Sequence, residues 1–215
     1  MDLLMELLSS LWLALGGPVF ELFGAPVSRA EVLGFLLALW MVGCNLRVHP
    51  LGWPLAILSS LLYFGVFWQS RLYGDASLQL LFAGLAAWGW WQWLRGTGAD
   101  GQALVVRRLE PRLRWQLAAL TLAGWPLLGL FLDRFTDTDV PWWDAAPTAA
   151  GLVGQWLLGR KYLDNWAVWV GVNLVSCGLF AYKQLWLTVI LYAVFAALSV
   201  LGWRTWRGLL GRVHA

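Results

Sequence analysis

Charged residues are scarce in this sequence: 13% of its 215 residues are Asp, Glu, Lys or Arg, whereas 60% are hydrophobic. A soluble fold of this size needs more charge than that to cover its surface. The few charges fall almost entirely between long apolar runs, as expected if the runs lie in hydrocarbon and the joints lie at lipid headgroups. The composition therefore excludes an ordinary soluble domain and indicates an all-α integral membrane protein.

Cysteine and histidine are equally rare, with only Cys44, Cys177, His49 and His214 in the chain. Both cysteines lie inside apolar runs, so neither a disulfide nor a metal site is expected. A membrane enzyme needs carboxylates, histidines or a nucleophile gathered at one depth, and here the acidic residues are scattered through the joints. We therefore expect no catalytic residue, no metal, no cofactor and no nucleic-acid partner. A membrane enzyme for lipid or isoprenoid substrates and a structural subunit stay as alternative classes.

Seven apolar runs approach the roughly 20 residues that a transmembrane helix needs. The predicted spans are 30–47, 52–70, 75–94, 115–132, 146–160, 164–182 and 185–204. The start of the fifth span is open between Asp144 and Pro147, because proline fits best in a first helical turn. Ahead of the spans, leucines recur at helical spacing. They predict an amphipathic, interfacial helix within residues 1–27, broken near Gly16.

Basic residues indicate the orientation of the spans. The joint between spans three and four holds five arginines, whereas the joint between spans four and five holds four aspartates. The positive-inside rule assigns the first joint to the cytoplasmic side. Carried through seven spans, this assignment places eleven basic residues inside and four outside. It predicts an external amino terminus and a cytoplasmic carboxyl terminus.

The chain repeats itself at an offset of 113 positions. Residues 53–93 align with residues 166–206 without a gap, and 12 of the 41 pairs are identical. The most telling pairs are Trp53/Trp166, Gly65/Gly178, Gly89/Gly202, Trp90/Trp203 and Trp93/Trp206. Because each copy holds two of three spans, the predicted architecture is a parallel 3+1+3 repeat with span four as linker. The corresponding segments are residues 28–95, a basic loop with the linker helix over 96–140, residues 141–207, and a tail over 208–215.

Trp166, Trp169 and Asn173 are spaced i, i+3 and i+7, so they share one face of a helix. Indole faces can hold a planar ring, and a cationic ring gains roughly 0.5 to 2 kcal/mol from such contacts. An amide at the end of the stripe can hydrogen-bond a carboxamide or a ribose hydroxyl. The alternatives are an interfacial anchor for Trp166 and a helix–helix hydrogen bond for Asn173.

Three further polar residues are candidates for contact with a solute. Gln155 lies in mid-span, where an amide faces either a cavity or a neighbouring helix. Gln79 has the same two interpretations, and Tyr182 is placed to line an outer vestibule. No ionisable residue is clearly central in a span, which argues against a proton relay.

Two groups of motifs resemble those of the PnuC-type vitamin transporters. LYGDASLQ at residues 72–79, followed by GWWQW at 89–93, resembles the third-span signature of that family. In the second half, Gln155, Arg160-Lys161, WAVW at 166–169, Asn173 and GWRTW at 202–206 follow in the family's order. The match covers nearly all of the chain after about Arg29.

This resemblance implies a SWEET-like seven-helix fold that assembles as a homotrimer in the bacterial inner membrane. It also implies uptake of nicotinamide riboside by facilitated diffusion, with the solute bound near the midplane of the bilayer between the repeats. A separate cytoplasmic kinase is then expected to trap the solute by phosphorylation. Sister groups of the family carry thiamine, riboflavin or deoxynucleosides, so these vitamins and nucleosides are the alternative solutes.

Overall fold

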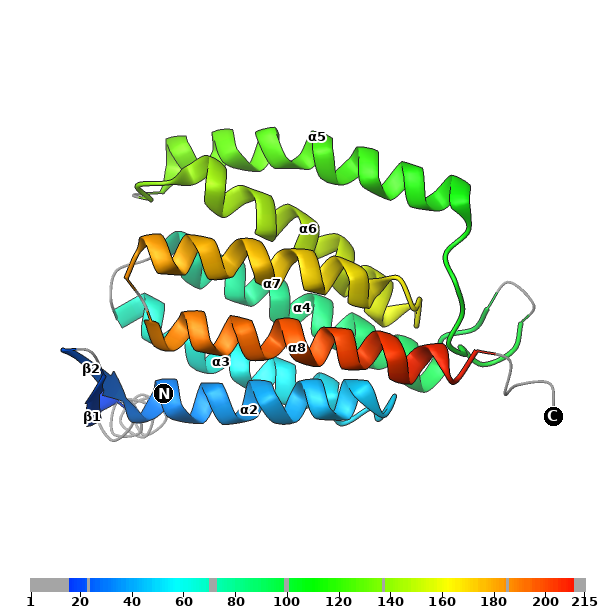
Figure 1. Ribbon diagram of the computed structural model, residues 1–215, viewed down its shortest axis with the longest axis horizontal. Helices are drawn as coiled ribbons and strands as arrows, with labels where there is room; N and C mark the ends of the chain where they lie inside the picture. The colour runs from blue at the N-terminus through cyan, green and yellow to red at the C-terminus, as the bar shows by residue number, and fades with distance from the viewer. Residues whose placement is uncertain are drawn as a thin grey trace, which may run out of the picture.

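Seven helices make up most of the part of the chain that the structure, a computed structural model, describes. The described residues are 16–22, 24–69, 73–98, 101–136, 138–184 and 186–210. The helices are α2 (Arg29–Leu46), α3 (Gly52–Gln69), α4 (Tyr73–Arg95), α5 (Pro111–Phe135), α6 (Pro141–Gly159), α7 (Asn165–Tyr182) and α8 (Trp186–Arg207). They lie side by side in one elongated bundle (Figure 1).

Each of the seven predicted spans overlaps one of these seven helices. Among the residues that the structure describes, three segments are both long and apolar enough to cross a membrane: Pro111–Phe135, Asn165–Tyr182 and Thr188–Arg207. Shorter apolar stretches cover Val32–Leu46 and Gly52–Gly65. The predicted start of the fifth span is wrong, because α6 begins at Pro141. This proline occupies the first turn, where its missing N–H costs no hydrogen bond, and Pro147 lies inside the helix.

A short β-hairpin precedes α2, with strands β1 (Pro18–Leu22) and β2 (Ala25–Ser28) paired antiparallel. The helix expected within residues 1–27 is therefore corrected over its last ten residues. Gly24 makes the turn with φ of +83°, a conformation that glycine adopts without steric cost. The leucine-rich part of that expected helix lies outside the described residues.

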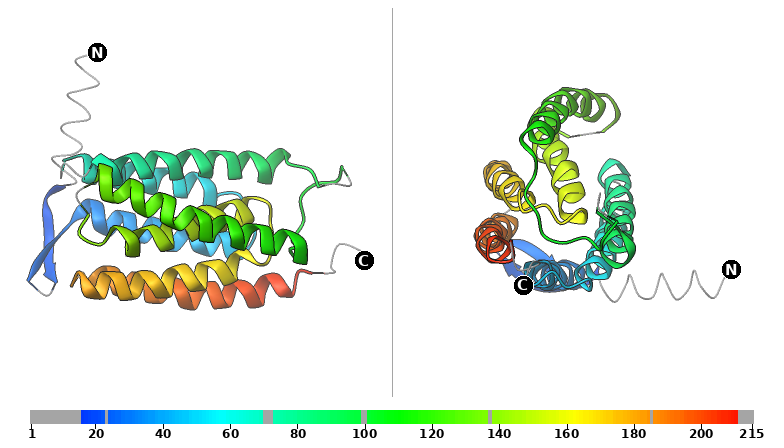
Figure 2. Two further views of the ribbon diagram at one scale, coloured as in Figure 1. Left: turned by 90° about the horizontal axis from the view of Figure 1, so that it is seen from above. Right: turned by 90° about the vertical axis from the view of Figure 1, so that its right-hand side faces the viewer.

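Most contacts join helices that follow one another along the chain. In the first half, α3 packs against α2 and α4, and in the second half α7 packs against α6 and α8. The halves meet where α2 contacts α8 and where α4 contacts α6. Helix α5 packs against α6 at the outer edge of the bundle (Figure 2, right). Of its described residues only Gly129 is buried, so α5 contributes little to the core.

The turn between α2 and α3 is repeated in the turn between α6 and α7. Val48 and Lys161, 113 positions apart, both have a positive φ, of 54° and 56°. The backbone hydrogen bonds also correspond: His49 N–H donates to the Cys44 carbonyl and Tyr162 N–H to the Leu157 carbonyl, both at 2.9 Å. A positive φ is unusual for a side chain branched at Cβ such as valine. The same uncommon turn is thus present in both halves.

Basic residues gather at one end of the bundle. The two turns, the loop 96–110 and the last turn of α8 all lie at that end, on the right in Figure 1. Together with the last residue of α4, Arg95, they carry the basic residues Arg47, Arg107, Arg108, Arg160, Lys161, Arg204 and Arg207. We call this the basic end.

Candidate functional site

A cavity of about 150 Å³ lies between the two halves of the bundle. The first half lines it with Met41, Val42, Asn45, Trp53 and Ala56. The second half lines it with Gln155, Leu158, Trp166, Trp169, Asn173, Tyr192, Phe195 and Ser199. Aromatic rings and amides dominate, and the described lining holds no carboxylate, ammonium, guanidinium or imidazole group. Such a cavity suits a small, planar solute with a few hydrogen-bonding groups.

Four of the six predicted contact residues meet at this cavity: Trp166, Trp169, Asn173 and Gln155. The other two do not line it. Gln79 is a half-buried residue of α4, and Tyr182, at the end of α7, is 61% exposed with its ring 5.7 Å from that of Trp143. The interfacial anchor is thus a poor description of Trp166, which is only 3% exposed. The role of these residues in binding stays a prediction.

The large tryptophans beside the cavity are seated on glycines. Trp53 lies directly on Gly89 of α4, and Trp166 lies in the same way on Gly202 of α8. A Cβ atom on either glycine would collide with the indole ring. Because glycine has no side chain, each ring can approach the helix backbone closely. This contact explains why the pairs Trp53/Trp166 and Gly89/Gly202 are both matched in the sequence repeat.

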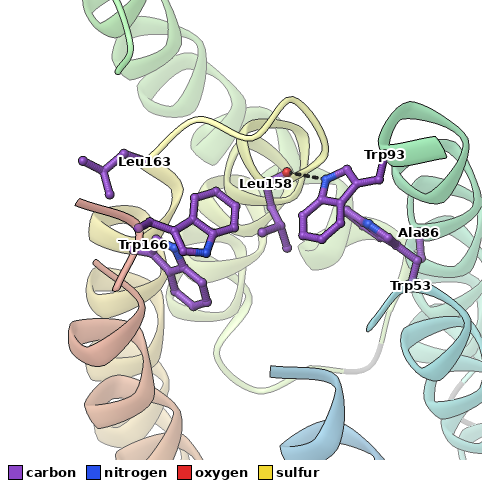
Figure 3. Close-up of a cluster of buried hydrophobic side chains, with 7 residues drawn as sticks. Trp53, Ala86, Trp93, Leu158, Leu163 and Trp166 are labelled. Carbon is purple, nitrogen blue, oxygen red and sulfur yellow. Dashed lines mark hydrogen bonds between the residues drawn. The ribbon is translucent and has the colours of Figure 1, made fainter. Parts of the chain in front are cut away.

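A second ring packs edge-on against each of these indoles. Trp53 and Trp93 have ring centroids 5.4 Å apart at an interplanar angle of 86°, and Trp166 and Trp206 have centroids 5.5 Å apart at 89°. This T-shaped geometry is favourable for aromatic pairs. Figure 3 shows Trp53, Trp93 and Trp166 with Leu158 between the two sides of the cluster.

The outer two tryptophans of this cluster bond across the halves. Trp93 Nε1–H donates to the Leu158 carbonyl, and Trp206 Nε1–H donates to the Asn45 carbonyl, both at 3.0 Å (Figure 3 shows the first). The two acceptors are themselves 113 positions apart. Both bonds lie next to the basic end, so they join the halves on that side of the cavity.

The inner two indoles have no such partner. Trp53 Nε1 and Trp166 Nε1 are buried, and neither has a hydrogen-bond acceptor among the residues that the structure describes. Buried donors normally find partners, because an unsatisfied one costs about 1–3 kcal/mol. Both residues line the cavity. The two nitrogen atoms themselves are covered by surrounding atoms, so the rings and not their N–H groups face the cavity.

Trp169 covers the side of the cavity formed by α6. Its ring lies against Gly151 and Gly154, with the indole Nε1 3.5 Å from the position of a Cβ on Gly154. At the matching position of the first half stands Ala56, which also lines the cavity. The cavity is therefore asymmetric, with its larger aromatic surface on the second half.

At the basic end, the turn between α6 and α7 contacts both the end of α4 and the loop that precedes α5. Arg160 donates to Gln92 Oε1 at 2.7 Å, and Lys161 Nζ donates to the Leu104 carbonyl at 2.9 Å. The Lys161 ammonium also lies 5.2 Å from the ring centroid of Trp93. Burial lowers the pKa of Lys161 below its ordinary value. An ion pair of 2.7 Å between Arg114 and Asp164 fixes the start of α5 nearby.

Sequence reasoning missed the contribution of α8. Tyr192, Phe195 and Ser199 line the cavity at spacing i, i+3 and i+7, the same spacing that singled out Trp166, Trp169 and Asn173. Asn45 of α2 is 5% exposed and also lines the cavity. The same i, i+3 and i+7 spacing in the sequence could have identified the three residues of α8 as candidates.

A helical membrane bundle with a small aromatic and amide cavity between two related halves has the architecture of a membrane transporter for small solutes. The sequence model described as nicotinamide mononucleotide transporter matches residues 28–208. The chain belongs to this family, that of the PnuC-type transporters, as the motifs predicted. The family and its structural relatives are transporters, which excludes the enzyme alternative.

Individual relatives match over most of their length. The riboflavin/roseoflavin transporter RibM of Streptomyces davaonensis is 28% identical over 195 residues, which is 89% of this chain and 91% of RibM. The nicotinamide riboside transporter PnuC of Escherichia coli is 23% identical over 209 residues, covering 85% and 87%. The crystal structure of the vitamin B3 transporter PnuC superposes with a TM-score of 0.70 at 21% identity, over 85% of this chain and 82% of that one. The last comparison shows that the fold is shared.

Proposed function

We propose that this protein takes up nicotinamide riboside, bound in the cavity between the two halves near the middle of the membrane. The observation that carries the proposal is the convergence of Trp166, Trp169, Asn173 and Gln155 on one cavity. Two indoles offer faces to a pyridinium ring, whose positive charge interacts well with their quadrupoles. The amides offer partners to the carboxamide and the ribose.

Riboflavin is the second candidate. The relative named as a riboflavin transporter is more similar in sequence to this chain than the Escherichia coli nicotinamide riboside transporter, at 28% against 23% identity. Nicotinamide riboside stays the first candidate because its single ring and ribose need less space than the three fused rings and ribityl chain of a flavin. Thiamine and deoxynucleosides are further candidates within the same class.

Transport is proposed to be facilitated diffusion. The described lining of the cavity contains no charged group that could couple solute movement to a proton or an ion. Net uptake then needs a reaction that removes the free solute inside the cell. Phosphorylation by a cytoplasmic kinase supplies it, because a phosphorylated solute no longer fits an uncharged cavity.

The architecture proposed is the parallel 3+1+3 repeat, SWEET-like, with α5 as the linker helix. Several equivalences at an offset of 113 support it: the two turns with positive φ, the two tryptophans seated on glycine, and the two hydrogen bonds between the halves. The contacts of α2 with α8 and of α4 with α6 exchange under the same offset. Homotrimeric assembly is proposed from the family resemblance, and the oligomeric mass of the purified protein tests it.

In the bacterial inner membrane, the basic end is proposed to face the cytoplasm, with the amino terminus outside and the carboxyl terminus inside. The concentration of arginines at that end supports this orientation through the positive-inside rule. Accessibility of single cysteines introduced in the loop 96–110 and in the turn between α7 and α8 would test it. Labelling of the loop from outside intact cells would overturn the assignment.

Calorimetry on the purified protein tests the solute. The proposal predicts saturable binding of nicotinamide riboside and weaker binding of thiamine. If the protein binds riboflavin in preference to nicotinamide riboside, riboflavin becomes the proposed solute and the proposed fold is unchanged. Failure to bind any of these vitamins or a deoxynucleoside would refute the proposed function.

A further inference from the structure

The Ser199 hydroxyl on α8 has a defined hydrogen-bond direction. Its Oγ donates to the Phe195 carbonyl one turn earlier, at 2.7 Å. A serine hydroxyl carries a single proton, so a hydroxyl that donates to its own helix can only accept from any other partner. Ser199 is therefore an acceptor toward the rest of the cavity.

This direction decides how the Asn173 amide is turned. Asn173 Nδ2 lies 3.3 Å from Ser199 Oγ. Because Ser199 can only accept, the amide must present its NH₂ group to it and not its carbonyl oxygen. Both residues line the cavity and are only 3% and 2% exposed. The Asn173 Oδ1 atom accepts no hydrogen bond from the residues that the structure describes.

We propose that Ser199 is a positioning residue that holds the Asn173 amide with its oxygen free for the solute, so that the cavity selects solutes bearing an N–H donor. The inference rests on the proposed function and specifies its solutes further. A carboxamide or a ring imide meets this requirement.

The first half of the bundle provides a reason to expect that the decisive variant folds. The residue at the position matching Ser199 is Ala86, which is 1% exposed. Alanine is thus accommodated at this depth of the helix, and Ser199→Ala removes the hydroxyl with little change of packing. Ser199→Thr keeps the hydroxyl, and Ser59→Ala removes a buried serine that does not line the cavity.

Selectivity between two isosteric solutes tests the proposal. Nicotinamide riboside is compared by calorimetry with its methyl-ketone analogue, in which CH₃ replaces NH₂ and no N–H donor remains. One neutral hydrogen bond predicts roughly tenfold tighter binding of the carboxamide to the wild type.

Ser199→Ala should reduce this ratio of affinities severalfold, and Ser199→Thr and Ser59→Ala should keep it. An unchanged ratio in Ser199→Ala would overturn the proposal. If riboflavin is the solute, riboflavin and N3-methylriboflavin form the corresponding pair.

A second measurement needs no solute and separates this inference from the proposed function. In protein labelled with ¹⁵N at asparagine side chains, the Asn173 NH₂ signal is assigned by its loss in Asn173→Asp. Ser199→Ala should move this signal and speed its exchange with water, and Ser59→Ala should not. An unmoved signal overturns the role of Ser199. Absence of binding of either solute pair to the wild type would refute the proposed function, while the NMR result still decides whether Ser199 orients the amide.

Discussion

Trp93 and Trp206, 113 positions apart, each donate an indole hydrogen bond of 3.0 Å to the opposite half of the bundle. Their rings also contact each other, with centroids 6.2 Å apart. Both are nearly buried, at 7% and 0% exposed. The two halves therefore hold each other by matching contacts beside the cavity.

Replacing either tryptophan by phenylalanine should destabilise the protein to a similar extent. Trp93→Phe and Trp206→Phe each remove one hydrogen bond, worth about 1 kcal/mol, together with part of a buried ring. The apparent Tm in detergent, followed by circular dichroism, should fall in both variants. Trp91→Phe is the control, because Trp91 is 54% exposed on the same helix as Trp93. A decrease in Trp91→Phe as large as in the other two would contradict this interpretation.

Alanine at the two glycines under the indoles should be harmful, although alanine usually strengthens a helix. The new methyl group in Gly89→Ala or Gly202→Ala would press on Trp53 or Trp166, and overpacking typically costs about 1–3 kcal/mol. Gly84→Ala on α4 and Gly171→Ala on α7 are matched controls, since nothing lies within 4 Å of the added atom. They should be neutral or stabilising. Equal thermal stability of all four variants would show that the indoles are not seated on the glycines.

Truncation of the aromatic and amide surface should weaken solute binding without unfolding the protein. Trp169→Ala removes a ring face and Asn173→Ala removes a hydrogen-bonding amide, so the Kd should rise roughly tenfold or more in each case. The matched control is Trp115→Ala, because Trp115 is 75% exposed on α5, away from the cavity. Calorimetry gives the Kd and gel filtration checks the fold. Wild-type affinity in both cavity variants would point to a different site.

Lys161 should make the stability depend on pH in the alkaline range. Burial lowers its pKa below the ordinary value of 10.5, so the folded protein holds this proton less tightly than the unfolded chain does. The resulting penalty is fully present below the folded pKa and disappears as the pH rises toward 10.5. The contribution of Lys161 to the free energy of unfolding should therefore become more favourable as the pH rises across that window. Lys161→Met removes the titrating group. The Tm advantage of this variant over the wild type should therefore be largest at the lower pH values and should shrink as the pH rises toward 10.5.

Lys161→Arg serves as the control for that experiment. Arginine keeps the positive charge but does not titrate in this range. It should lose the pH dependence, as the methionine variant does, while keeping the cost of a buried charge at all pH values. A pH profile in both variants identical to that of the wild type would rule out a contribution from Lys161.

The spans and the repeat could be predicted from the sequence because both leave a one-dimensional signal. A membrane span needs a long apolar run, and the pairs Trp53/Trp166 and Gly89/Gly202 recur because each indole needs its glycine. The hairpin of β1 and β2 left no comparable signal. Its strands have five and four residues and follow a stretch that was already interpreted as the end of a helix.

The site was predicted only where spacing along one helix was sufficient. The stripe Trp166, Trp169 and Asn173 identifies a face, and the structure places that face on the cavity. Spacing cannot say which faces of different helices meet, so Gln79 was included although it does not line the cavity. Ser199 was overlooked because its importance lies in a contact with a residue 26 positions away.

The asymmetry of the cavity has a consequence for how such a protein can evolve. Trp93 and Trp206, which join the halves, are identical in the two copies, and so are Trp53 and Trp166 at the cavity. Other cavity positions have diverged: Ala56 corresponds to Trp169, and Ala86 corresponds to Ser199. A duplicated ancestor could thus acquire a new solute by substitutions in one copy while the other preserved the frame. Members of this family that carry different vitamins should accordingly differ most at the cavity positions of α6, α7 and α8.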